Sequence, residues 1–153
     1  MSKSKVALQH AVKPSREPPY VGALLRICWR AARDRLDEAI RAAGFVDLQD
    51  QHLLVFSYPP PEGHRPSEIA RRLGATRQAA NYMIGQLEDL GYLERRAEGD
   101  SGRRLVWLTA RGREVTRVMH VTLEALEAEW AEEVGAEDFD AMMRALRRLA
   151  KVE

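Results

Sequence analysis

Residues 66–112 read PSEIARRLGATRQAANYMIGQLEDLGYLERRAEGDSGRRLVWLTARG, and the turns and apolar positions of this stretch decide the fold. Pro66 suits the first position of a helix, and Gly74 supplies a left-handed turn that ends it after about two turns. Thr76 is placed to cap a second helix, which Gly91 stops. Two short helices joined by a Gly-Ala-Thr turn predict a helix-turn-helix.

After Gly91 the apolar period changes to two residues. The segments 92–96 and 104–108 flank a polar turn that contains Gly99 and Gly102, a pattern typical of a β-hairpin. In winged DNA-binding proteins a helix enters the major groove, and such a basic hairpin reaches the adjacent backbone or minor groove. The stretch therefore predicts a winged helix-turn-helix.

The flanking segments predict further helices. Apolar residues recur at three- and four-residue spacings from Val21 to a stop at Gly44, and Asp47 is a plausible N-cap for a second helix that the prolines at 59–61 end. Thr109 can cap a long helix, which Gly135 separates from a last one. We expect an all-α fold with a small β-hairpin wing.

The domain organisation follows from these elements. Residues 1–19 are polar, contain prolines and lack periodicity, so we expect a flexible N-terminal arm. Residues 20–153 are expected to form a single domain. Within it, 66–109 form the helix-turn-helix and wing, and the helices of 20–44 and 110–150 mediate dimerisation.

Composition restricts the functional class. The net charge is only +1, but residues 62–113 carry ten arginines against seven acids, a basic middle suited to a phosphate-facing surface. The single cysteine excludes an intramolecular disulfide. We find no nucleophile paired with a base, no phosphate loop and no metal-ligand spacing, so we expect neither an enzyme, a cofactor nor a metal. The N-terminus shows no apolar run long enough for a signal peptide, and no stretch approaches about 20 apolar residues, so we expect a cytoplasmic protein rather than a membrane protein.

The second helix of the motif carries the candidate DNA-binding residues. If its apolar residues face inward, the outward side presents donors and acceptors suited to phosphates and base edges, with Arg for guanine or phosphate and Gln and Asn for adenine. These residues are Thr76, Arg77, Gln78, Asn81 and Tyr82, joined by Arg103 at the tip of the wing. The alternative is an ordinary solvated face, and Arg95 and Arg96 have nearby acids that favour salt bridges.

The stretch 66–112 resembles the core of the MarR family. It has the two-helix motif, the Leu-Glu-x-x-Gly-Tyr-Leu exit at 87–93, an arginine-containing wing, and Leu-Thr-x-x-Gly at 108–112 leading into a long helix. The resemblance implies a homodimeric repressor of a pseudo-palindromic operator in duplex DNA, relieved by a small-molecule effector. The family's wing usually carries Asp-x-Arg, whereas here Gly102 occupies the arginine position and Arg103 follows it.

The resemblance also implies a pocket for a small aromatic effector between the dimerisation helices and the DNA-binding motif. Its candidate lining residues are His52, Phe56, Tyr58 and His120, for which ordinary core and rim packing is the alternative. Two other functions stay open. One is a winged-helix protein-interaction module without DNA binding, and the other is a redox-sensing regulator that uses Cys28, although a cysteine in an apolar stripe usually packs as a small hydrophobe.

Overall fold

The computed structural model describes residues 17–57 and 59–152, so most of the expected N-terminal arm and Tyr58 lie outside the described residues. The described chain is mostly helical with a small antiparallel sheet, which confirms the expected fold class. The elements are α1 (Val21–Ala42), α2 (Asp50–Phe56), β1 (Glu62–His64), α3 (Pro66–Leu73), α4 (Arg77–Asp89), β2 (Leu93–Ala97), β3 (Arg104–Leu108), α5 (Ala110–Val134) and α6 (Ala136–Ala150).

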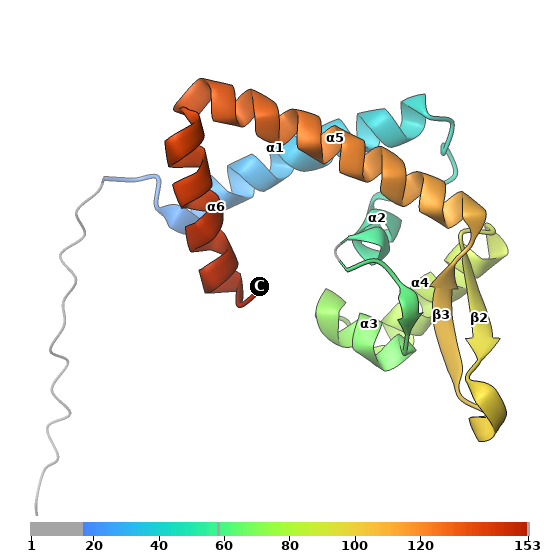
Figure 1. The fold of residues 1–153 in the computed structure, drawn as a ribbon. Helices are drawn as coiled ribbons and strands as arrows, with labels where there is room; N and C mark the ends of the chain where they lie inside the picture. The colour runs from blue at the N-terminus through green and yellow to red at the C-terminus, as the bar shows by residue number, and fades with distance from the viewer. Residues whose placement is uncertain (1–16, 58, 153) are drawn as a thin grey trace, which may run out of the picture.

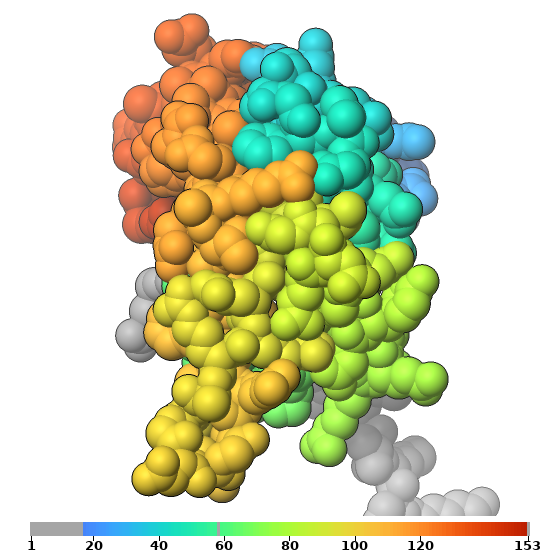
Figure 2. All heavy atoms as spheres, turned by 90° about the vertical axis from the view of Figure 1, so that its right-hand side faces the viewer, coloured from blue at the N-terminus to red at the C-terminus, as the bar shows by residue number. Residues whose placement is uncertain are grey.

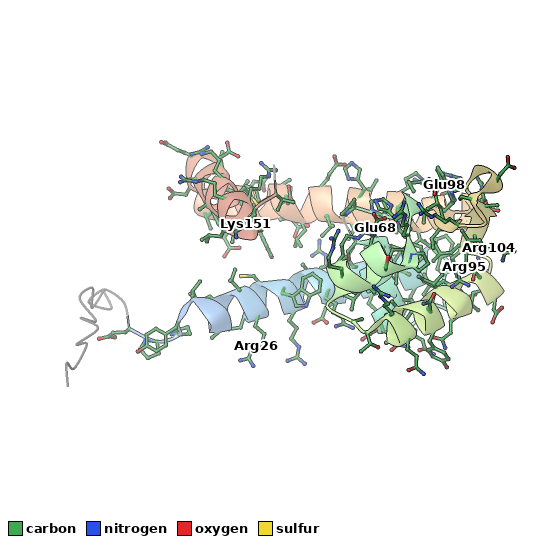
Figure 3. The ribbon with its side chains drawn as sticks, turned by 90° about the horizontal axis from the view of Figure 1, so that it is seen from below. Arg26, Glu68, Arg95, Glu98, Arg104 and Lys151 are labelled. Carbon is green, nitrogen blue, oxygen red and sulfur yellow. The ribbon has the colours of Figure 1, made fainter. Side chains whose placement is uncertain are left out.

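The long helices form a scaffold on one side of the domain. In Figure 1, α5 runs across the top and α1 crosses it, while α2, α3, α4 and the sheet lie below the end where α5 begins. At its other end α5 gives way to α6, which turns back downward after Gly135. Seen from below, the first half of α1 extends away from the helix-turn-helix (Figure 3). The helix-turn-helix and the outer half of α1 therefore occupy opposite ends of the molecule.

The sheet contains the predicted hairpin and one additional strand. β2 pairs antiparallel with β3, with Leu93 opposite Leu108 and Arg95 opposite Val106. β1 pairs with the other side of β3, so the strand order is β1-β3-β2. The sequence did not predict β1 because three residues, Glu-Gly-His, are too few to show a period of two.

The core joins the second half of α1 to the helix-turn-helix. Leu36 and Ile40 of α1 are buried with residues of α2, α4, α5 and the sheet. At its centre Tyr92 is fully buried, and its ring makes edge contacts with Phe45 and Phe56 at centroid distances of 6.0 Å each. These contacts hold the exit of α4 against the scaffold.

Two predicted helix caps are confirmed. The hydroxyl oxygen of Thr76 accepts from the Ala79 N–H at 3.1 Å, and that of Thr109 accepts from the Gly112 N–H at 3.1 Å. Gly112 also has a packing role, because a Cβ there would lie 2.2 Å from the carbonyl oxygen of Tyr92. The start of α5 can therefore approach the segment between α4 and β2 closely only with glycine.

The prediction that Asp47 caps α2 is wrong. The N-cap is Gln49, whose backbone N–H donates to Nδ1 of His52 at 3.2 Å. Asp47 instead accepts from the Tyr92 hydroxyl at 2.5 Å and from Arg111 at 2.9 Å. Asp47 lies close to the start of α2, but its carboxylate bonds to residues 45 and 64 positions away in the sequence instead of capping the helix.

Candidate nucleic-acid interface

The buried side of α4 fixes which residues face outward. Ala80, Ile84 and Leu87 have no exposed surface, as the sequence pattern predicted. The other side of the first two turns is exposed and includes Arg77, Gln78, Asn81 and Tyr82. Helix α4 thus presents a polar face of donors and acceptors away from the core.

The turn before α4 has the geometry of a helix-turn-helix. Gly74 ends α3 in the left-handed conformation with φ of 61°, and Thr76 begins α4 as its N-cap. Because the Thr76 oxygen already accepts from Ala79, its hydroxyl proton is the group left to contact an acceptor. Thr76 is exposed and suited to donate to a phosphate oxygen.

The wing projects beside α4 as a separate lobe (Figure 2). A short 3₁₀ turn at Gly99–Ser101 forms its tip, and Gly102 follows with φ of 67°. The Glu98 N–H donates to the carbonyl oxygen of Arg103 at 2.7 Å, which closes the loop around the glycine. The left-handed turn at Gly102 thereby leaves the Arg103 side chain exposed at the end of the wing.

Ion pairing separates the arginines of this region into two groups. Arg95 pairs with Glu88 at 3.2 Å, and Arg96 pairs with Glu94 while its guanidinium lies 5.3 Å from the Trp107 ring centroid. The salt-bridge alternative considered for these two arginines is therefore the arrangement seen. Among the arginines of α4 and the wing, those that are exposed and form no ion pair with a described residue are Arg77, Arg103 and Arg104.

The positions of the arginines agree with this division. Figure 3 shows Arg104 at the outer edge of the wing and Arg95 on the side of α4. Within α4 and the wing, the arginines without an ion pair thus lie at the start of α4 and at the end of the wing. This is the distribution needed to neutralise phosphates on both sides of a groove.

Comparison with known proteins supports the assignment from geometry. A family model described as MarR family matches residues 46–104. The HTH-type transcriptional repressor Rv2887 of Mycobacterium tuberculosis is 32% identical over 109 residues, covering 71% of this chain and 77% of that repressor. This chain belongs to the MarR family. Members of this family are transcription factors.

Solved structures of MarR-family proteins have the same fold. The M. tuberculosis MarR family protein Rv2887 in complex with salicylic acid superposes with a TM-score of 0.60 at 29% identity, covering 88% of this chain and 98% of that one. The transcriptional repressor CouR bound to a 23-mer DNA duplex gives a TM-score of 0.64 at 20% identity, covering 86% and 92%. The second likeness supports the fold alone.

A cavity of about 530 Å³ lies between α1, α2 and α5 of this MarR-family domain. Of the candidate effector-pocket residues, Phe56 and His120 line this cavity, but His52 does not. His52 is buried on the other side of α2, where it bonds to Gln86 of α4. The sequence did not predict the other lining residues, which come mainly from α5 and include Trp29, Leu36, Arg113, Thr116, Arg117, Met119 and Leu123.

Cys28 is exposed, contrary to the expectation that it packs in an apolar stripe. The stripe is present in α1, but only its second half is covered, at Leu36 and Ile40. The uncovered half of α1 carries exposed Val21, Leu24, Leu25, Ile27 and Trp29.

Among the described helices of this MarR-family chain none is long and apolar enough to cross a membrane.

Proposed function

We propose that this protein is a sequence-specific DNA-binding repressor that inserts α4 into the major groove. The observation that carries the proposal is the exposed first turn of α4, where the side chains of Arg77 and Gln78 face solvent. Arg103 at the wing tip would reach the adjacent backbone or minor groove. Rv2887, the relative named above, is itself called a transcriptional repressor. This function is DNA binding, which requires neither a chemical step nor a cofactor. We propose that the protein acts in the cytoplasm, where it meets the DNA.

We further propose that the repressor is a homodimer, because α1 and α6 present apolar side chains to solvent. Val21 is 70% exposed and Leu149 is 78% exposed, values that a covering partner would reduce. In this arrangement residues 20–44 and 110–150 form the dimer interface, and 66–109 form the DNA-binding part of each protomer. A two-fold axis would place two α4 helices on half-sites about 34 Å apart in a pseudo-palindromic operator.

We propose the cavity between α1, α2 and α5 as the site of a small aromatic acid that relieves repression. Its apolar lining comes from Phe56, Met119 and Leu123, which suit an aromatic ring. Arg113 and Arg117 lie at the same site and can pair with a carboxylate. Rv2887, the relative described above, has been solved with salicylic acid bound. Binding would then favour a dimer with a different separation of the two α4 helices and lower DNA affinity.

The protein-interaction alternative predicts apolar or acidic side chains on the outward face of α4. The first two turns instead expose arginine, glutamine, asparagine and tyrosine. Exposure of Cys28 permits a reaction with an oxidant, but the thiol lies on the part of α1 that we assign to the dimer interface. DNA recognition is therefore the function that these surfaces support best.

Selection of bound fragments from random duplex DNA tests the proposal. A repressor of this kind should enrich a motif with two related halves, and the complex should contain two protein chains. Enrichment of no motif above the starting pool would contradict sequence-specific binding.

A further inference from the structure

A chain of hydrogen bonds runs from the start of α2 to the exposed face of α4. The backbone N–H of Gln49 lies 3.2 Å from Nδ1 of His52, and Nε2 of His52 lies 3.2 Å from Oε1 of Gln86. Gln86 in turn donates from Nε2 to the hydroxyl oxygen of Tyr82 at 3.3 Å. His52 is 1% exposed and Tyr82 is 66% exposed, so the chain connects the core to the surface proposed to face DNA.

The backbone N–H of Gln49 determines which atom donates and which accepts in every hydrogen bond of this chain. A backbone N–H can only donate, so Nδ1 of His52 must accept. A neutral imidazole then carries its proton on Nε2, which must donate to the oxygen of the Gln86 carboxamide. The amide nitrogen of Gln86 is left to face Tyr82, whose oxygen accepts.

This order of donors and acceptors determines the hydrogen-bonding role of the Tyr82 hydroxyl. Because its oxygen accepts from Gln86, the hydroxyl proton of Tyr82 is directed elsewhere, and most of the side chain is open to solvent. We propose that His52 and Gln86 are positioning residues that hold Tyr82 as a hydrogen-bond donor toward DNA. The partner of Tyr82 is then an acceptor, either a phosphate oxygen or an acceptor on a base edge such as guanine O6 or thymine O4. This inference rests on the proposed DNA binding by α4.

A double-mutant cycle on operator affinity tests the linkage between Gln86 and Tyr82. Tyr82→Phe removes the donated proton and should weaken binding about fivefold for each half-site, the usual effect of one neutral hydrogen bond. Gln86→Met should weaken binding by about two- to fivefold in the wild-type background and have little further effect in the Tyr82→Phe background. Gln51→Met is the matched control. Gln51 lies on α2 and donates to the side chain of Gln49, so it takes no part in the hydrogen bonds that link the Gln49 backbone to Tyr82. It should bind within about twofold of wild type.

A second variant guards against loss of folding in Gln86→Met, which leaves buried His52 without its acceptor. Gln86→Glu keeps an acceptor for His52 but also accepts from Tyr82, which turns the hydroxyl proton away from DNA. The negative charge of the new glutamate weakens DNA binding whether or not Tyr82 is present. The proposal therefore predicts that Gln86→Glu lowers operator affinity more in the wild-type background than in the Tyr82→Phe background. If the effects at 82 and 86 simply multiply for both variants, the positioning role is wrong.

The tautomer of His52 gives a test that needs no DNA. Nitrogen NMR of the imidazole in the full-length protein should show Nε2 protonated and Nδ1 unprotonated at neutral pH. A proton on Nδ1, in the other neutral tautomer or in the imidazolium, would overturn the proposed direction of the chain.

The outcomes separate this inference from the proposed function. If the wild-type protein binds no selected duplex, both are overturned. If it binds and Tyr82→Phe binds equally well, only the role of Tyr82 and its positioning residues is overturned. When Tyr82→Phe weakens binding on every duplex alike, the acceptor is a phosphate oxygen, whereas a loss confined to the selected operator assigns it to a base edge.

Discussion

The guanidinium of Arg95 on β2 donates from Nη2 to Oδ1 of Asn81 on α4 at 3.3 Å. Arginine has only donors, so the oxygen of the carboxamide must face it. The nitrogen of the same carboxamide donates to the carbonyl oxygen of Arg77 at 3.0 Å. Asn81 therefore keeps one free N–H, which can donate to a single acceptor on DNA.

This relationship predicts that Arg95 acts on DNA binding through Asn81 rather than through a phosphate. Arg95→Met should weaken operator binding by ~1 kcal/mol, because Asn81 and Glu88 both lose a partner. The slope of log affinity against log salt concentration should change by less than about half a unit. A flattening of the slope by a full unit per protomer would show that Arg95 contacts a phosphate directly.

Arg103 is predicted to supply the phosphate or minor-groove contact of the wing. Arg103→Ala should flatten the salt dependence by about one unit per protomer, or about two per dimer. Arg104→Ala is the control: Arg104 begins strand β3, and because successive side chains of an extended strand point to opposite faces, its loss should change the slope much less than that of Arg103. Equal slopes for wild type and Arg103→Ala would mean that Arg103 makes no wing contact with DNA, and that Gly102 at the family's arginine position leaves this contact absent.

The effector cavity predicts binding of a small aromatic acid such as salicylic acid. Arg117→Ala should raise its Kd about five- to tenfold, because a charge-assisted partner for the carboxylate is lost. Arg41→Ala is a matched control, since Arg41 is likewise an exposed helical arginine paired with a carboxylate, Asp37, but lies away from this cavity. Isothermal titration of the three proteins measures the effect, and unchanged affinity in Arg117→Ala would remove this residue from the site.

The contact between Tyr92 and Asp47 predicts how stability depends on pH. Burial, reinforced by the hydrogen bond to Asp47, raises the pKa of Tyr92 above its usual range. A raised pKa in the folded state contributes stability that is complete below about pH 10 and is lost as the pH rises beyond it. The melting temperature of wild type should therefore fall more steeply above pH 10 than that of Tyr92→Phe.

The same contact acts in the opposite direction at low pH. Partial burial alone would raise the pKa of Asp47, but hydrogen bonds from Tyr92 and the backbone, together with the charge and hydrogen bond of Arg111, outweigh it and leave the pKa below its usual value. Stability from Asp47 is then present above about pH 4 and is lost as the pH falls. Asp47→Asn should lose ~1 kcal/mol at neutral pH and show a weaker acid dependence. Parallel unfolding curves for both variants and wild type across pH would contradict this account.

Local signals in the sequence predicted most helix boundaries. Gly74, Gly91 and Gly135 stand where helices end, and Thr76 and Thr109 cap helices as expected. These features depend on neighbouring residues and are visible in the sequence. The apolar spacing in α4 likewise predicted its buried side, and hence the candidate residues on the other side.

Features that depend on tertiary contacts could not be predicted in this way. The role of Asp47 depends on Tyr92 and Arg111, and that of His52 depends on Gln86, 34 residues away. His52 and Phe56 are four residues apart in the sequence, yet His52 points toward α4 while Phe56 lines the cavity. Nothing in the local pattern of α2 shows which side each neighbouring helix will cover.

Recognition of DNA sequence by α4 is tested most directly by operator affinity after changes at its first exposed turn. Arg77→Ala and Gln78→Ala should each weaken binding to the selected operator by ~1 to 3 kcal/mol if they contact bases, with little change in melting temperature. Gln51→Ala on the exposed side of α2 should leave affinity unchanged. Unchanged operator affinity in both Arg77→Ala and Gln78→Ala would contradict the proposal that α4 reads the major groove.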